Sequence, residues 1–172
     1  RLHVVRVVNG FAAGPAGAAP EPAEYAAAFA ALAGLDEVST VAAPGYSAFA
    51  DLDGGAVYRA IQAALLAHVA EPLRYRLAVL DAPPGVSPGV LRDLRGQVDS
   101  SHAALYYPWL IAANPRANAV GTQPAQIALP PSGFVCGIYA RVDAQRGVHK
   151  APANEPVLGA LGLERELGDA EK

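Results

Sequence analysis

The residues best suited by type to covalent chemistry are Ser100, Ser101 and His102, which are consecutive in the chain. A histidine beside a serine can act as a general base and convert the hydroxyl into a nucleophile. Such a triad also needs an acid that orients the imidazole, and the spacing of the acids singles none of them out. We also expect no nucleophile elbow of the GxSxG type. An α/β hydrolase therefore remains only an alternative hypothesis. A stand-alone binding domain is a further alternative.

Cys136 and His149 form the second candidate pair, for thiol chemistry. A helix N-terminus can lower the pKa of a thiol, but Cys136 follows Val135 in an apolar segment, where a small buried thiol is the usual case. Because it is the only cysteine, an internal disulfide and a cysteine metal cage are excluded. Asp81 ends an apolar run, where a carboxylate is more often a loop cap or an ion-pair partner than a catalyst.

Metal and phosphate chemistry have weaker support. Asp51 and Asp53 are close together but lack the rest of a calcium-loop spacing, and we expect them to cap the following helix. The sequence contains neither GxGxxG nor GxxxxGK[ST], the phosphate-binding patterns. We therefore expect no catalytic residue, no cofactor and no metal ion, and a protein that is not an enzyme.

The composition indicates a folded protein, and its low share of charged residues fits either a surface partly covered by other chains or simply an Ala-rich bacterial composition. Hydrophobic residues make up 52% of the 172 residues, whereas charged residues make up only 17%. The net charge is −3 and the pI about 5.8, without a Lys/Arg cluster, so no nucleic-acid partner is expected. The apolar runs are too short to span a bilayer, and the sequence predicts synthesis in the cytoplasm.

Hydrophobic periodicity defines the elements that must position these residues. In the clearest helix, Ala56–Ala70, apolar residues recur every four positions, and in Arg76–Asp81 they are nearly continuous, as in a strand covered on both faces. The expected strands are Arg1–Val8, Val38–Ala43, Arg76–Asp81 and Ala103–Trp109. The expected helices are Glu21–Ala33, Ala56–Ala70, Ser87–Gly96, one opened by Pro130-Pro131 and capped by Ser132, and a short one at Pro156–Leu161.

Strands and helices alternate from residue 38 to residue 107 as βαβαβ. This order predicts an α/β fold with a mostly parallel sheet and helices on both faces. Loops are expected at Phe11–Pro20 and after Trp109, and Val90, Leu91 and Leu94 should face inward from their helix. We expect residues 1–172 to form a single α/β domain.

One series of motifs is more specific than any candidate for catalysis. Tyr106–Leu110 reads YYPWL, Leu129–Gly133 reads LPPSG, Gly137–Ala140 reads GIYA, and Arg146–Glu155 reads RGVHKAPANE. In this order they closely resemble the tail sheath proteins of contractile phages, tailocins and extracellular injection particles. The resemblance covers roughly Glu24–Glu164, and its sheath domain is often described as subtilisin-like in fold.

The resemblance implies a structural role. Sheath subunits polymerise around an inner tail tube and contract to drive it through a target envelope. The implied partners are other sheath subunits, the inner tail tube and the baseplate, and the target membrane is met only indirectly. The particle would be a virion or a phage-tail-like particle assembled in the bacterial cytoplasm.

Two further expectations follow from this resemblance. Candidate subunit-contact residues are Arg141, Asp143, Arg146, His149 and Lys150. The alternative is that their loop is simply ordered against its own domain. The C-terminal region through which family members interlock is expected to be absent from this chain, which should then fold without polymerising.

Overall fold

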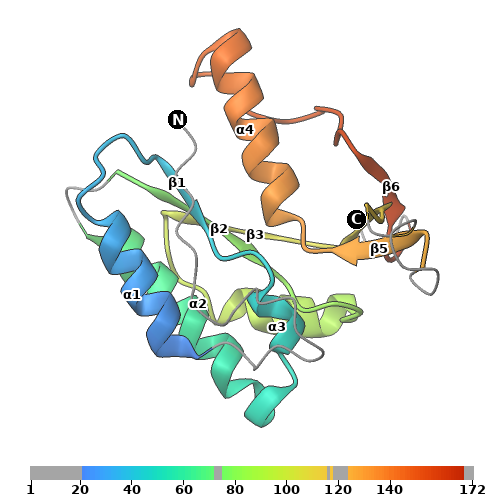
Figure 1. Ribbon diagram of the computed structural model, residues 1–172, viewed down its shortest axis with the longest axis horizontal. Coiled ribbons are helices and arrows are strands. Elements are labelled where there is room, and N and C mark those ends of the chain that lie inside the picture. Colours follow the sequence, from blue (N-terminus) through green and yellow to red (C-terminus); the bar gives the residue numbers. More distant parts are fainter. Residues whose placement is uncertain (1–20, 72–74, 116, 118–123, 169–172) are drawn as a thin grey trace.

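The computed structural model describes residues 21–71, 75–115, 117 and 124–168 (Figure 1). The expected strand Arg1–Val8 and the expected loop Phe11–Pro20 lie outside these ranges.

A parallel sheet forms the centre of the fold. Its strands, β1 (Thr40–Ala42), β2 (Leu77–Asp81) and β3 (Ala103–Tyr106), lie in the order β1-β2-β3. Helix α2 (Ala56–Ala70) links β1 to β2, and α3 (Pro88–Gly96) links β2 to β3. The predicted βαβαβ core is therefore confirmed, and β2, nearly all buried, is its central strand.

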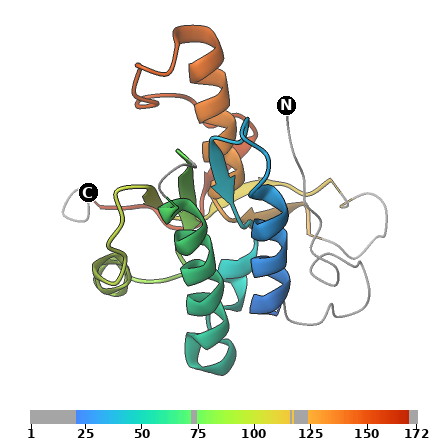
Figure 2. The ribbon, with the colours of Figure 1, turned by 90° about the vertical axis from the view of Figure 1, so that its left-hand side faces the viewer.

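Helices cover both faces of this sheet. Helix α1 (Pro22–Leu32) packs beside α2 below the sheet, with α3 on the same side, whereas α4 (Ser132–Arg146) lies above it (Figures 1 and 2). The core on the lower side includes Tyr25 and Phe29 of α1, Ile61 and Leu65 of α2, and Val41 of β1. The layers agree with the sequence-based prediction.

The region after β3 differs from the prediction. The expected strand Ala103–Trp109 ends at Tyr106, and a cis Tyr107–Pro108 bond precedes a second, antiparallel sheet. Its strands, β4 (Leu110–Ala113), β5 (Gln126–Leu129) and β6 (Ala160–Leu163), lie in the order β5-β4-β6. The loop predicted after Trp109 thus contains two strands, and the helix predicted at Pro156–Leu161 is wrong.

Local signals explain the helix boundaries only in part. Ser87 is the N-cap of α3, and its hydroxyl accepts a hydrogen bond from Val90 N, as predicted. Val90 itself is 47% exposed, so its predicted inward position is wrong. Two short 3-10 helices, Tyr46–Phe49 and Leu52–Gly55, fill the connection between β1 and α2.

Candidate functional site

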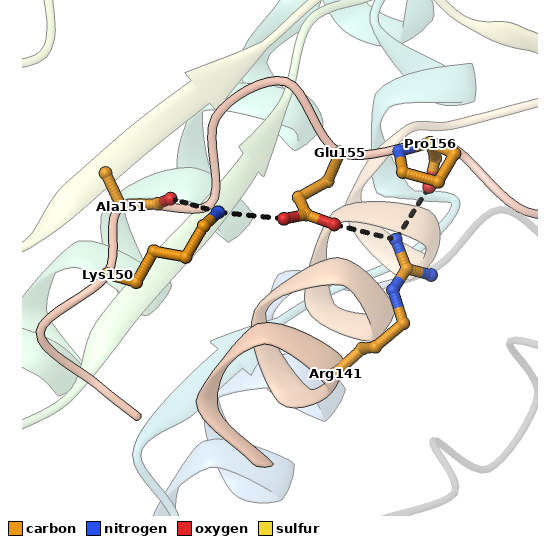
Figure 3. A network of polar contacts seen from close by, with 5 residues as sticks. All are labelled: Arg141, Lys150, Ala151, Glu155 and Pro156. Carbon is orange, nitrogen blue, oxygen red and sulfur yellow. Dashed lines mark hydrogen bonds and ion pairs between the residues drawn. The ribbon is translucent and has the colours of Figure 1, made fainter. Parts of the chain in front are cut away.

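The C-terminal end of α4 and the segment that follows it form a compact polar network (Figure 3). The helix ends at Gly147, whose φ of 88° falls in the left-handed region that favours glycine. The chain then returns along α4, and Lys150 Nζ donates to Glu155 Oε1 at 2.8 Å. Arg141 Nη2 lies 3.8 Å from Glu155 Oε2 and donates to the carbonyl of Pro156 at 2.7 Å. Glu155 thus joins a helix residue to a residue of the loop.

Opposite charges hold Glu155 in its ionised form. Its hydrogen bond from Lys150 lowers the pKa of the carboxyl, and the positive charges of Lys150, Arg141 and Arg146 lower it further. A carboxylate between two cations accepts stronger hydrogen bonds than a neutral acceptor does. The network therefore fixes how residues 148–156 lie against α4, in the segment leading to β6.

The predicted contact residues divide into two groups. Arg141 and Lys150 are engaged by Glu155 within the chain, whereas Asp143, Arg146 and His149 are exposed. Among the residues that the structure describes, the side chains of these three make no hydrogen bond or ion pair. Arg141 and Lys150 thus have a partner within their own chain, whereas the other three predicted contact residues face solvent.

Glu155 was missing from the candidate residues. It lies five positions after Lys150 in the same motif, and this opposite charge was the available signal. A spacing of five in an irregular segment has no fixed geometry, unlike the i, i+4 spacing of a helix. The pairing therefore emerges only from the path of the chain after Gly147.

Replacing Glu155 with glutamine should loosen this loop. The neutral amide loses both ion pairs, so trypsin should cleave after Lys150 several-fold faster in the variant than in the original protein. Acid should also loosen the loop. Because the pKa of Glu155 is lowered in the folded protein, the network stabilises the loop at pH values above the ordinary carboxyl range, and this stabilisation is lost as the pH falls through the folded pKa. Glu166→Gln, at an exposed position, is the matched control. Equal cleavage rates in the Glu155→Gln and control variants would contradict this role.

An apolar groove lies next to the network. It has a volume of about 610 Å³ and Arg141 is the only charged residue in its lining. Phe134 and Ile138 of α4 and Pro44 after β1 contribute to its walls, and Leu158, itself 65% exposed, also lines it. The groove and the exposed leucine in its lining thus form an apolar surface beside the polar network.

The serine and histidine candidates do not form a triad. Ser101 Oγ lies 3.1 Å from His102 Nδ1, and Ser100 Oγ accepts from the backbone N of His102. No carboxylate of the described residues bonds to this imidazole, and His102 is exposed. The sequence singles out no acid to orient the ring, and the part of the chain that the structure describes supplies none.

One hydrolase pattern was overlooked in the sequence. Gly85–Gly89 reads GVSPG, which matches the sequence pattern GxSxG, so the expectation that this pattern is absent is wrong. In a nucleophile elbow the serine sits on a sharp turn between strand and helix. Here Ser87 lies six residues beyond the end of β2, and its hydroxyl caps α3 by accepting from Val90 N. Its role in this structure is that of an N-cap.

The surroundings of Cys136 and Asp81 indicate structural roles for both residues. Burial and, to a lesser extent, the charge of Asp81 raise the pKa of the Cys136 thiol to about 11, so the thiol is protonated at neutral pH. His149 lies beyond the opposite end of α4 from Cys136. Asp81 is fully buried, with Oδ1 accepting from Ser132 N at 2.7 Å and Oδ2 from Ser132 Oγ at 2.6 Å.

This contact corrects the predicted start of α4. The N-cap position belongs to Pro131, and no side chain of a cap residue bonds there, so Ser132 is not the cap. Asp81 instead reaches the first turn of the helix from the end of β2, a sequence separation of 51 residues. Asp81 thus acts as a structural anchor, as the usual role of a carboxylate at a strand end suggests.

Within the described ranges there is no cluster of three or more side chains that could hold a metal ion, and no helix is long and apolar enough to cross a bilayer. Asp51 and Asp53 are exposed, and they do not cap α2 as predicted, since Gly55 is its N-cap with a φ of 82°.

Comparisons with known proteins agree on one family. Residues 18–172 match the family described as the phage tail sheath protein central domain. The fold is similar to that of a chain in the anti-feeding prophage helical sheath in its contracted state, with a TM-score of 0.61 and 25% identity. It is equally similar to a chain in the anti-feeding prophage baseplate, with a TM-score of 0.60 and 25% identity.

The matched region is a limited part of those larger chains. Each alignment covers 91% of this chain, but only 38% of the sheath chain and 37% of the baseplate chain. No curated protein matches the chain.

Proposed function

The chain belongs to the phage tail sheath protein family, and we propose that it is part of a structural subunit that polymerises around an inner tail tube and contracts to drive the tube through a target envelope. The family match over residues 18–172 carries this proposal. The similarity to a contracted helical sheath supports it, because that protein adopts this fold within a polymer. The fold is thus compatible with repeated, tightly packed copies.

The proposed partners follow from the same role. They are further sheath subunits, the inner tail tube and the baseplate, with no nucleic acid and only indirect contact with the target membrane. The similarity to a chain of the anti-feeding prophage baseplate structure supports a particle of the phage-tail type. We infer that assembly takes place in the bacterial cytoplasm, that the subunit has no enzymatic activity of its own, and that residues 1–172 act as one sheath core domain.

Electron microscopy of the complete gene product tests the proposal directly. Expressed alone or with its cognate tube protein, it should form hollow striated tubes or tube-filled sheaths in negative stain. Dispersed particles in both preparations would contradict a sheath function.

We further propose that the basic end of α4 contributes to the contact between subunits. The exposed side chains of Arg146 and His149 lie beside Lys150, and the groove with Leu158 at its rim opens on the same helix. A charged rim around an apolar centre is the usual anatomy of an interface. The Glu155 network fixes the loop that carries His149 and Lys150, directly after Arg146 at the end of α4.

Charge reversal separates this contact from the fold. The double variant Arg146→Glu, His149→Glu should unfold at an unchanged temperature, because both side chains are exposed, but its yield of assembled sheath should fall at least tenfold. Arg92→Glu, at an exposed position on α3, is the matched control and should assemble normally. Normal assembly of the double variant would exclude the contact and leave the sheath function itself standing.

A further inference from the structure

Exposed apolar side chains gather in the segment that follows α4. In the described part of the chain, five of the seven large hydrophobic residues that are exposed lie between residues 148 and 163. They are Val148, Val157, Leu158, Leu161 and Leu163. Leu158 lines the groove beside α4, together with Gly133 and Gly137 of that helix. Large apolar side chains that gather in one region, and are not scattered singly, point to a surface that binds another molecule.

The groove allows a close approach and has a basic rim. Gly133 and Gly137 lie about one helical turn apart, and an added Cβ at either position would meet no atom of another element within 4 Å. Arg141 lines the groove, and Arg146 ends the same helix. Lys150 follows shortly after, so three cations face only two acids, Asp143 and Glu155, along this stretch of chain. The groove thus suits a slim, acidic partner.

Helix α1 presents an unusual surface on the other side of the sheet. The exposed residues of this helix are all alanines, at positions 23, 26, 27, 30 and 31. This spacing places them on one stripe of the helix, opposite the buried Tyr25 and Phe29. A helix that faces water normally carries polar side chains on its outer stripe. The alanine face of α1, defined by these five residues, is therefore suited to close contact with another chain.

Acidic residues surround the alanine face. Residues 21–71, which include α1, β1 and α2, contain seven carboxylates and one arginine. Glu21 and Glu24 lie at the start of α1, and Asp36 and Glu37 follow shortly after its end. The alanine face and the groove are thus two apolar surfaces with rims of opposite charge. Such complementarity favours contact between them, and it disfavours contact of either surface with a copy of itself.

We propose that the groove beside α4 receives the alanine face of α1 from a second copy of this chain. The inference names the partner of the proposed subunit contact, and it rests on the proposed sheath function. The carboxylates at the two ends of α1 would then lie near Arg141 and Arg146 of the neighbour. The short alanine side chains would let α1 approach Gly133 and Gly137 closely.

The positions of the two surfaces determine the type of assembly. Helices α1 and α4 lie on opposite sides of the central sheet, so the two surfaces of one molecule cannot meet each other (Figures 1 and 2). Each copy therefore offers its groove to one neighbour and its alanine face to another. A contact between two different surfaces is heterologous, and it repeats from copy to copy to form a ring or a helical polymer.

Polar substitutions on the alanine face test the docking in the complete gene product. The double variant Ala27→Gln, Ala30→Gln should unfold at an unchanged temperature, because both positions are exposed and glutamine is a good helix former. Its yield of assembled sheath should fall at least tenfold, because two amide side chains would be buried in an apolar groove. Ala60→Gln, Ala63→Gln has the same spacing on exposed positions of α2 and is the matched control. Normal assembly of the α1 variant, or an equal loss in the control, would overturn the proposal.

Cysteine cross-linking shows which two surfaces meet. In a Cys136→Ser background, Gly137→Cys together with Ala27→Cys should give a ladder of dimers, trimers and longer chains when assembled sheath is treated with a short bismaleimide. Gly137→Cys together with Ala63→Cys, on α2, is the matched control and should stay monomeric.

The outcomes separate the docking from the sheath function. An original protein that does not assemble would contradict the sheath function itself. Assembled sheath without the ladder, or dimers formed by Gly137→Cys or Ala27→Cys alone, would overturn the docking and leave the sheath function standing.

Discussion

Replacing Arg76 with alanine is expected to lower the free energy of unfolding by about 3–5 kcal/mol, the range found when one member of a buried charged network is removed. Arg76 is only 2% exposed. Its guanidinium donates to the carbonyl of Leu35 at 2.6 Å, to that of Val38 at 3.0 Å and to His68 Nε2 at 2.7 Å. These contacts join the α1–β1 connection, the end of α2 and the start of β2.

The cost is large because three acceptors lose their donor in a poorly hydrated place: His68 is buried, and Leu35 and Val38 are partly buried. Two carbonyls and an imidazole nitrogen lose charge-assisted donors, and each unsatisfied buried group costs about 1–3 kcal/mol. Since Arg76 is always charged, His68 Nε2 must be the acceptor, which places the imidazole proton on Nδ1. The packing of His68 against Phe29, with ring centroids 5.8 Å apart, extends the disturbance to α1.

Thermal and denaturant unfolding measure this effect. A loss of that size should lower the Tm by about 10 °C in a chain of this length. Arg76→Lys should fall between the alanine variant and the original, because one ammonium cannot reach all three acceptors. Arg92→Ala, at an exposed position, should change stability by less than about 0.5 kcal/mol. If Arg76→Ala lowers the free energy of unfolding by less than about 1 kcal/mol, the hydrogen bonds of Arg76 do not stabilise the fold as predicted.

The elements with strong periodicity could be predicted from the sequence. Helix α2 has the predicted bounds, Ala56–Ala70, because its apolar positions recur at helical spacing and Pro72 follows closely. The near-continuous apolar run of β2 correctly indicated a strand covered on both faces, with only its start differing by one residue. In these segments a local pattern and the tertiary environment impose the same periodicity.

The second sheet could not be predicted, for a physical reason. Strands β4, β5 and β6 have four residues each, too few for a clear alternation, and in β6 leucine alternates with the small residues Ala160 and Gly162. Leu161 and Leu163 are also exposed, so β6 shows no buried face. These strands are defined by the pairing of β5 and β6 with β4. The paired residues are far apart in the sequence, so a short stretch of sequence does not reveal the pairing.

The candidate site was predicted as a set of charges and not as a set of contacts. The motif placed Arg141 and Lys150 correctly near the end of α4, but their pairing with Glu155 depends on the turn at Gly147. The role of Asp81 depends in the same way on Ser132, 51 residues later. The sequence analysis considered Asp81 without its partner, and it did not single out Glu155 at all.

Asp81 should make the domain less stable as the pH rises from 4 to 7. Burial raises the pKa of this carboxyl from 3.8 to about 6, and the two hydrogen bonds from Ser132 only partly offset that burial. Between these values the folded protein binds more protons than the unfolded chain, so stability falls as pH rises. At 1.36 kcal/mol per pKa unit, the contribution that is present below pH 3.8 and lost above pH 6 amounts to about 3 kcal/mol.

Asp81→Asn isolates this contribution, because the amide is neutral at every pH and keeps the shape of the carboxyl group. Its oxygen can still accept from Ser132 N, and its NH₂ can donate to Ser132 Oγ. The stability of the original protein minus that of the variant should therefore fall by about 3 kcal/mol between pH 3.5 and 7.5, measured by urea unfolding at a series of pH values. Asp93→Asn, at an exposed position on α3, should give a nearly constant difference. A difference for Asp81→Asn that is flat, or that grows with pH, would show that the hydrogen bonds from Ser132 outweigh burial, and that the anchor at the start of α4 is ionised throughout.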